Sequence, residues 1–163
     1  MSALPDAESH ATLQNYRAEF APMTTDALDA VMVIEQAAYA HPWTRGNFAD
    51  SLATGYEGRL LRTSERLLGY YMAMKGVDEV HLLNITVAPD CQGQGLGVCL
   101  LESLAAWSLG QGAQWLWLEV RASNEGAQRL YQRRGFRRVG LRKGYYPAGP
   151  GRREDAIVMS RPL

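Results

Sequence analysis

The chain has 163 residues, 47% of them hydrophobic, which is enough for one globular domain with a full core that needs no disulfide or metal to stay folded. Its 17 basic and 17 acidic side chains cancel, which argues against nucleic acid as a direct ligand. No apolar stretch approaches the ~20 residues of a membrane span, and the N-terminal segment lacks the basic start and apolar core of a signal peptide. We therefore predict a soluble cytoplasmic protein without membrane contact.

The composition along the chain predicts a simple organisation. Residues 1–15 are polar and acidic and read as a loose N-terminal extension, whereas residues 16–163 read as a single domain. The two cysteines, Cys91 and Cys99, have no metal or redox spacing and are interpreted as ordinary thiols. Charge is unevenly spread: residues 1–120 hold 6 basic and 14 acidic side chains, and residues 121–163 hold 11 basic and 3 acidic. Solvated faces explain this asymmetry most simply.

The first half of the chain predicts short helices followed by an antiparallel meander. Apolar residues at helical spacing follow a possible threonine cap, and Ser64-Glu65-Arg66 between two apolar runs is a hairpin signal. The expected elements are a strand over Tyr16–Phe20, a helix capped by Thr24 or Thr25, a short helix restarted by Thr44 after Pro42, and strands over Arg59–Thr63, Leu67–Met74 and Val80–Val87.

The second half predicts a β-α-β unit with parallel strands, because two apolar strand-like runs flank one apolar helical stripe. The expected elements are a helix over Leu96–Leu109, a strand over Trp115–Val120, a helix from Ser123 or Asn124 to Arg134, and strands over Phe136–Leu141 and Ala156–Ser160. Together the elements indicate an α/β (α+β) fold, with a mixed, mostly antiparallel central sheet and helices on both faces.

A glycine-rich loop joins the first strand of that unit to its helix. Glycines let backbone N–H groups approach an anion closely, and the helix start contributes roughly half a positive charge. The loop lacks the Gly-Lys-Ser/Thr ending of a Walker loop, and Gly93, Gly95 and Gly97 run G-x-G-x-G rather than in the dinucleotide pattern. The remaining pattern is Gln-x-x-Gly-x-Gly, which resembles the pyrophosphate loop of coenzyme A-dependent N-acetyltransferases; the alternative is an ordinary turn.

Glu119 is the one acidic residue in the apolar strand Trp115–Val120. Burial of a carboxylate disfavours its charged form, which would raise its pKa toward the range useful for a general base. Glu119 is therefore our candidate base. The competing interpretation is a glutamate that reaches solvent at the strand end or pairs with Arg121.

Asn124 and Tyr131 lie seven positions apart, two helical turns, so both project from nearly the same helix face and could touch one ligand. The competing interpretations are a helix cap for Asn124 and a core position for Tyr131. The three histidines, His10, His41 and His81, are dispersed without ligand spacing, so no metal is expected.

Several segments together resemble one enzyme family. They are His41–Thr44, Asn84–Val87, Gln92–Gly97, Trp117–Asn124, Leu130–Tyr131, Gly135–Phe136, Tyr145–Tyr146 and Arg153–Ala156. On these segments, nearly everything after about residue 20 resembles the ribosomal-protein-alanine N-acetyltransferases, a branch of the GNAT superfamily. The glycine loop marks the superfamily. The branch is marked by the double tyrosine, the run Glu119–Asn124 and the ending Glu154-Asp155-Ala156.

The resemblance implies the GNAT fold, with acetyl-CoA as co-substrate and no metal. It also implies roles for individual residues. Glu119 would be the proton acceptor, Tyr131 the proton donor, and both Asn124 and Tyr131 coenzyme contacts. Backbone groups of Ile85, Thr86 and Val87 would bind the acetyl and pantetheine part, and the pyrophosphate would lie on Gln92, Gly93, Gln94, Gly95, Leu96 and Gly97.

The resemblance further implies that the acceptor is the N-terminal alanine of a small-subunit ribosomal protein. The sequence departs from the family pattern in its N-terminal extension and at Gly144, where a polar residue is expected before the double tyrosine. The expected reaction is direct attack by the α-amine in a ternary complex. An α-ammonium has a pKa of ~8 against ~10.4 for lysine, so it is the easier amine to deprotonate.

Two alternatives remain open on the sequence. A same-fold enzyme that acetylates lysine or a small amine would share every coenzyme residue and differ in the acceptor loops, around His41–Phe48 and Tyr145–Arg153. A non-catalytic acyl-CoA-binding sensor is the other alternative, and it would bind acetyl-CoA without transferring the acetyl group.

Overall fold

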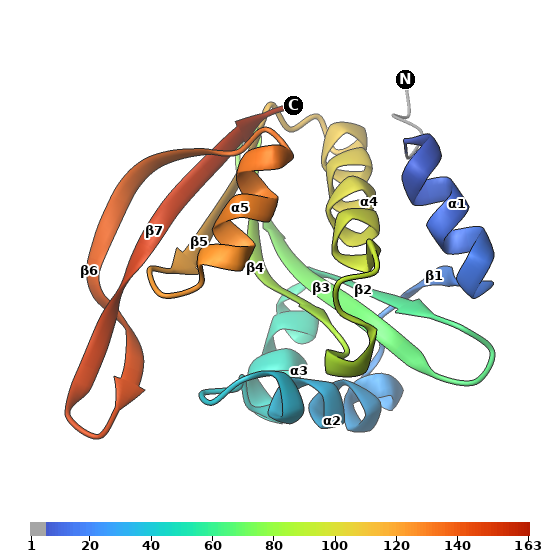
Figure 1. The fold of residues 1–163 in the computed structure, drawn as a ribbon, viewed down its shortest axis with the longest axis horizontal. Coiled ribbons are helices and arrows are strands. Elements are labelled where there is room, and N and C mark those ends of the chain that lie inside the picture. The colour runs from blue at the N-terminus through green and yellow to red at the C-terminus, as the bar shows by residue number, and fades with distance from the viewer. Residues whose placement is uncertain (1–5) are drawn as a thin grey trace.

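Seven strands form one mixed sheet in the order β1-β2-β3-β4-β5-β7-β6, with helices on both faces (Figure 1). The computed structural model describes residues 6–163. The strands are β1 (Glu19–Pro22), β2 (Glu57–Arg62), β3 (Leu67–Lys75), β4 (Glu79–Val87), β5 (Trp115–Arg121), β6 (Arg137–Gly149) and β7 (Arg152–Pro162). The helices are α1 (Ala7–Tyr16), α2 (Leu28–Ala38), α3 (Arg45–Thr54), α4 (Leu96–Gly110) and α5 (Glu125–Arg133), with short 3-10 helices η1 (Thr25–Ala27) and η2 (Pro89–Cys91). The predicted fold class is confirmed.

The N-terminal segment differs from the predicted loose extension, because α1 occupies Ala7–Tyr16. The Asp6 side chain accepts a hydrogen bond from the Ser9 N–H and so caps the helix. The helix packs against α4 (Figure 1). The weak amphipathic pattern of this short polar segment hid the helix from sequence reasoning, and the first strand accordingly begins at Glu19 rather than at Tyr16.

The predicted β-α-β unit is confirmed as β4, α4 and β5, with parallel strands. Within residues 6–163, β4 and β5 pair only where Glu79–Leu82 face Trp115–Leu118. Beyond that point the two strands separate, although β4 continues to Val87 and β5 to Arg121. Backbone groups at the carboxyl ends of these strands are therefore left without a ladder partner on the sides that face each other.

Alternation along β3 explains how the sheet holds helices on both faces. Tyr70 points to the side of α2 and α3, where it stacks edge-on against Phe48 at 5.7 Å between ring centroids. On the opposite face, a Cβ added at Gly69 would lie 3.2 Å from the Leu100 side chain of α4. Tyr70 and Leu100 are fully buried, and both belong to the continuous hydrophobic core.

Gly69 gives a direct test of this packing. A Cβ at this position would lie 2.6 Å from the Thr86 carbonyl oxygen and 3.3 Å from Val87 Cα, and backbone cannot yield as a side chain can. We expect Gly69→Ala to lower the free energy of unfolding by about 1–3 kcal/mol. Chemical denaturation measures this. The matched control is Gly110→Ala at the end of α4, where nothing lies within 4 Å of the added Cβ; equal losses in the two variants would contradict the packing argument.

The two last strands are longer than predicted and form a two-stranded arm that extends beyond the rest of the sheet (Figure 1). An acceptor loop was expected around Tyr145–Arg153, but the chain is paired there through bulges, with a turn only at residues 150–151. Gly144 has φ +59°, a left-handed conformation that favours glycine, which explains its departure from the expected polar residue. No helix within residues 6–163 is long and apolar enough to cross a membrane.

Candidate active site

Two cavities meet where β4 and β5 separate. One, of about 770 Å³, lies over the glycine loop and α5, and the other, of about 330 Å³, lies toward α2 and the β6–β7 arm. Among the residues that the structure describes, four line both: Tyr39, Ile85, Asn124 and Tyr131. A molecule in the first cavity and a molecule in the second would therefore meet beside these four residues.

The first cavity has the features of an anion-binding site. The predicted glycine loop lines it through Gln92, Gly93, Gly95, Leu96 and Gly97. Gly95 is the N-cap of α4 with φ +86°, and it gives the first N–H groups of the helix no side-chain partner. The first turn of α4 also carries no acidic residue. Free N–H donors at the positive end of a helix are suited to an anion.

The side chains around the loop agree with this assignment. Gln92 donates a hydrogen bond from Nε2 to the Val87 carbonyl at 3.2 Å and so ties the loop to the end of β4. Arg133, at the end of α5, is the one charged residue among the described residues that line the cavity. A cavity with a guanidinium group and no carboxylate is electrostatically suited to a polyanionic coenzyme.

Glu119 lines the second cavity, but its surroundings differ from those expected. Its side chain is only 8% exposed, as the apolar strand suggested. However, Oε2 lies 2.5 Å from His81 Nε2 on β4, and Oε1 lies 3.3 Å from Arg142 Nε on β6. The anticipated partner, Arg121, instead pairs with Glu154 at 2.7 Å. Glu119 is therefore a carboxylate at the cavity wall, held between an imidazole and a guanidinium group.

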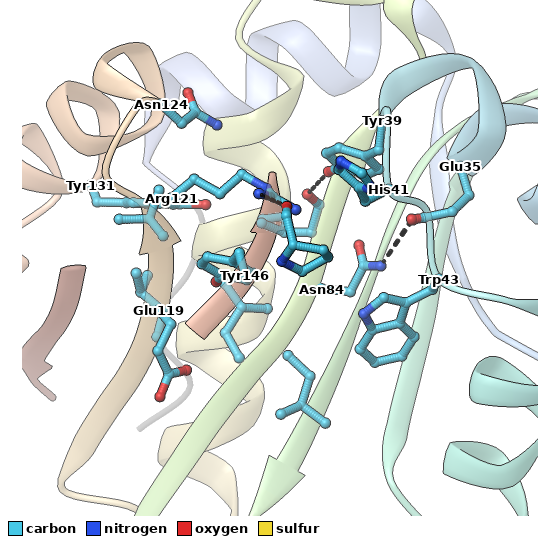
Figure 2. A pocket seen from close by; sticks show the side chains of 16 residues that line it. Glu35, Tyr39, His41, Trp43, Asn84, Glu119, Arg121, Asn124, Tyr131 and Tyr146 are labelled. Carbon is cyan, nitrogen blue, oxygen red and sulfur yellow. Dashed lines mark hydrogen bonds between the residues drawn. The ribbon is translucent and has the colours of Figure 1, made fainter. Parts of the chain in front are cut away.

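Tyr131 lies on α5 and Asn124 lies at its N-cap, and both residues line both cavities; Figure 2 shows them at the wall of the second cavity. The Tyr131 ring is nearly buried and packs against Phe136 at 5.7 Å between centroids. Burial raises the pKa of the Tyr131 hydroxyl above its ordinary value, so the phenol keeps its proton at neutral pH. Asn124 caps α5, since its Oδ1 accepts from the Ala127 N–H at 3.1 Å. The structural use of Asn124 is thus confirmed, and its coenzyme contact stays a prediction.

The walls of the second cavity come from both expected acceptor loops. His41 and Trp43 line it from the segment between α2 and α3, and Tyr146 and Pro147 line it from β6. Arg121 holds the arm in place: its Nη1 donates to the Pro147 carbonyl at 2.7 Å, and its guanidinium lies 4.6 Å from the centre of the Tyr146 ring. The cavity is therefore aromatic and partly polar, with an entrance shaped by segments far apart in the sequence.

A hydrogen-bonded chain next to this cavity was missed by sequence reasoning. It links the buried residues Glu35, Asn84, Thr86 and Tyr70 to Tyr39, which is 38% exposed at the cavity end of the chain. Burial raises the pKa of Glu35, although hydrogen bonds from the Asn84 amide and the Tyr70 hydroxyl act in the opposite direction. In the sequence, the signal for burial of Glu35 is only its position among apolar residues at helical spacing.

The glycine loop at a helix start, the separated strands and the two meeting cavities define a coenzyme A-dependent acyltransferase of the GNAT type. Comparison with known families agrees, since residues 28–136 match the acetyltransferase (GNAT) family. The chain belongs to this family, whose members are acetyl-CoA-dependent acyltransferases.

The chain is also similar to individual proteins. It is 43% identical over 140 residues to the [ribosomal protein bS18]-alanine N-acetyltransferase of Escherichia coli strain K12, covering 86% of this chain and 93% of that protein. The crystal structure of the ribosomal-protein-S18-alanine N-acetyltransferase from Escherichia coli superposes with a TM-score of 0.83 at 39% identity, covering 90% of this chain and 94% of that one. A GNAT family acetyltransferase from Elizabethkingia anophelis, solved with acetyl-CoA bound, shares the fold with a TM-score of 0.71 at 22% identity, over 90% of this chain and 98% of that one.

Proposed function

We propose that this protein transfers the acetyl group of acetyl-CoA to the N-terminal α-amine of alanine on a small-subunit ribosomal protein. The observation that carries the proposal is the meeting of two differently built cavities at Tyr131, one suited to an anionic coenzyme and one to an acceptor chain end. The names of the similar proteins supply the acceptor class, ribosomal protein bS18 with an N-terminal alanine.

The proposal assigns coenzyme binding to the first cavity. The N–H groups of Gln92, Gly93, Gln94, Gly95, Leu96 and Gly97 hold the pyrophosphate at the start of α4. Backbone groups of Ile85, Thr86 and Val87, on the part of β4 that has no partner on β5, align the pantetheine and acetyl part, and Asn124 contacts the coenzyme from the N-cap of α5. Acetyl-CoA supplies an activated thioester carbonyl, and a backbone N–H near Val87 stabilises the negative charge that develops on its oxygen.

The chemical step converts an α-ammonium into an amide, so it removes two protons from the nitrogen and delivers one to the sulfur; the second nitrogen proton passes to water as the tetrahedral intermediate collapses. Glu119 accepts a proton from the α-ammonium through an intervening water, because the Glu119 carboxylate points away from Tyr131 in Figure 2. The free amine attacks the thioester carbon directly, without an acyl-enzyme. Tyr131 donates its proton to the departing thiolate, which its buried hydroxyl is suited to do at neutral pH.

Substrate competition tests this function. We expect acetylation of an alanine-starting peptide from the ribosomal protein to exceed that of an N-terminally blocked lysine peptide and of a polyamine by at least ~100-fold in kcat/KM, because an α-amine is far easier to deprotonate than a side-chain amine. Mass spectrometry of the products identifies the modified nitrogen. Preference for lysine or for the polyamine would show that the acceptor is not an N-terminal α-amine. Tight acetyl-CoA binding with no transfer to any amine would indicate a non-catalytic sensor.

A further inference from the structure

In the hydrogen-bonded chain beside the second cavity, every donor points toward Glu35. Glu35 Oε1 accepts from Asn84 Nδ2 and from the Tyr70 hydroxyl, each at 2.9 Å. Since the Asn84 amide turns its NH₂ group toward this carboxylate, its Oδ1 faces the other way and accepts from Thr86 Oγ1 at 2.8 Å. The single hydroxyl proton of Thr86 is thereby used.

This direction fixes the role of Tyr39. Its hydroxyl oxygen lies 2.7 Å from Thr86 Oγ1 and 3.0 Å from the Ile85 carbonyl. Thr86 has no proton left to give and a carbonyl has none, so Tyr39 must donate to β4 in either contact. Burial raises the pKa of Tyr39 to about 12, so the hydroxyl keeps its one proton at neutral pH. The lone pairs of its oxygen are then the only hydrogen-bonding capacity left for a ligand.

The position of the Tyr39 hydroxyl oxygen indicates which kind of ligand it can bind. Tyr39 is one of the four residues that line both cavities, and Figure 2 shows it beside His41 at the edge of the second one. Every dipole in the chain points its positive end toward the buried Glu35, so the oxygen at the cavity end carries the negative end of the series. Such an oxygen is suited to a cationic or neutral N–H donor and not to a carbonyl or a phosphate.

We infer that Tyr39 is an acceptor-binding residue, whose hydroxyl oxygen receives a hydrogen bond from the α-amine of the substrate, and that Thr86, Asn84 and Glu35 are positioning residues that orient it. This inference rests on the proposed function, because it assumes that an α-amine enters the second cavity. It adds a substrate contact supplied by the segment after α2, on the opposite side of the junction from Tyr131.

The test compares two substitutions that both remove the hydrogen bond between the Tyr39 hydroxyl and Thr86 Oγ1. Tyr39→Phe removes the oxygen, and we expect the KM of an alanine-starting peptide to rise by ~10-fold with the KM of acetyl-CoA unchanged, since a hydrogen bond to a charged group is lost. Thr86→Val breaks the chain but leaves the Tyr39 oxygen free to accept, so the peptide KM should rise by less than ~3-fold. Tyr56→Phe should behave as the wild type, because Tyr56 lines neither cavity.

Peptide affinity measured by calorimetry with CoA present makes the result independent of turnover. Equal KM increases in Tyr39→Phe and Thr86→Val would show that only the network matters and would overturn the inference, as would a loss of acetyl-CoA affinity in Tyr39→Phe. A wild type that binds the peptide without acetylating it would refute the proposed function, while a weaker Tyr39→Phe complex would still support the contact. A wild type that does not bind the peptide would overturn both.

Discussion

Replacement of Glu119 by glutamine is expected to lower kcat on an alanine-starting peptide by ~100-fold, with acetyl-CoA affinity unchanged, because a general base contributes at least this factor. Glutamine keeps the size of the side chain and can still accept a hydrogen bond, but it cannot take up a proton. Glu119 lines only the second cavity, so its loss should leave the coenzyme cavity intact. Steady-state kinetics combined with calorimetric titration of acetyl-CoA measures both quantities.

The pH dependence of this variant separates a base from a structural carboxylate. An α-ammonium loses its proton with a pKa of ~8, so raising the pH supplies free amine without help from the enzyme. The deficit of Glu119→Gln should therefore shrink between pH 7 and about 9.5, whereas a purely structural defect should persist across that range. A kcat within about twofold of the wild type at pH 7 would remove Glu119 from the proton path.

Glu102→Gln is the matched control for that substitution. The Glu102 side chain is 19% exposed and pairs with Arg161 at 3.6 Å, so the substitution also removes a partly buried ion pair. Glu102 lines neither cavity. We expect near wild-type kcat from it. The melting temperature of both variants shows how much of any loss is unfolding, since Glu119→Gln also deprives His81 and Arg142 of their charged partner.

The structural elements around the proposed coenzyme site could be predicted from the sequence because their determinants are local. A strand, a glycine loop and a helix start follow one another in the chain, and the chemistry of that turn depends on backbone N–H groups that any sequence of this pattern presents. The loop at Gly93–Gly97 and the β4-α4-β5 unit were accordingly predicted with nearly correct bounds.

The acceptor side could not be predicted in the same way, because its contacts cross the sheet. The partners of Glu119 come from β4 and β6, and neither strand order nor register can be read from an apolar run. The chain from Glu35 to Tyr39 joins residues 49 positions apart, as in the bond between Glu35 and Asn84. Each of these residues has an ordinary local interpretation, and only the folded structure shows that they satisfy one another.

Tyr131→Phe is the second substitution with a large expected effect. The ring should keep its packing against Phe136 and its place in the core, so the fold and acetyl-CoA affinity should persist. The loss of the hydroxyl leaves the departing thiolate without a proton donor, and kcat should fall by ~100-fold. Tyr56→Phe serves as the control, because it removes a phenol oxygen that lines neither cavity.

The pH profile gives this role a sharper test than the rate alone. A general acid acts only while it is protonated, and burial has raised the pKa of Tyr131 above the ordinary value of about 10. The activity of the wild type should therefore show no decline from loss of this proton up to pH ~10, the range in which an unperturbed tyrosine would begin to titrate.

An acidic leaving group should rescue the variant: with a thioester of an aromatic thiol, Tyr131→Phe should approach the wild-type rate. An equal deficit with both thioesters would assign Tyr131 to packing at the junction and leave the thiolate to be protonated by solvent.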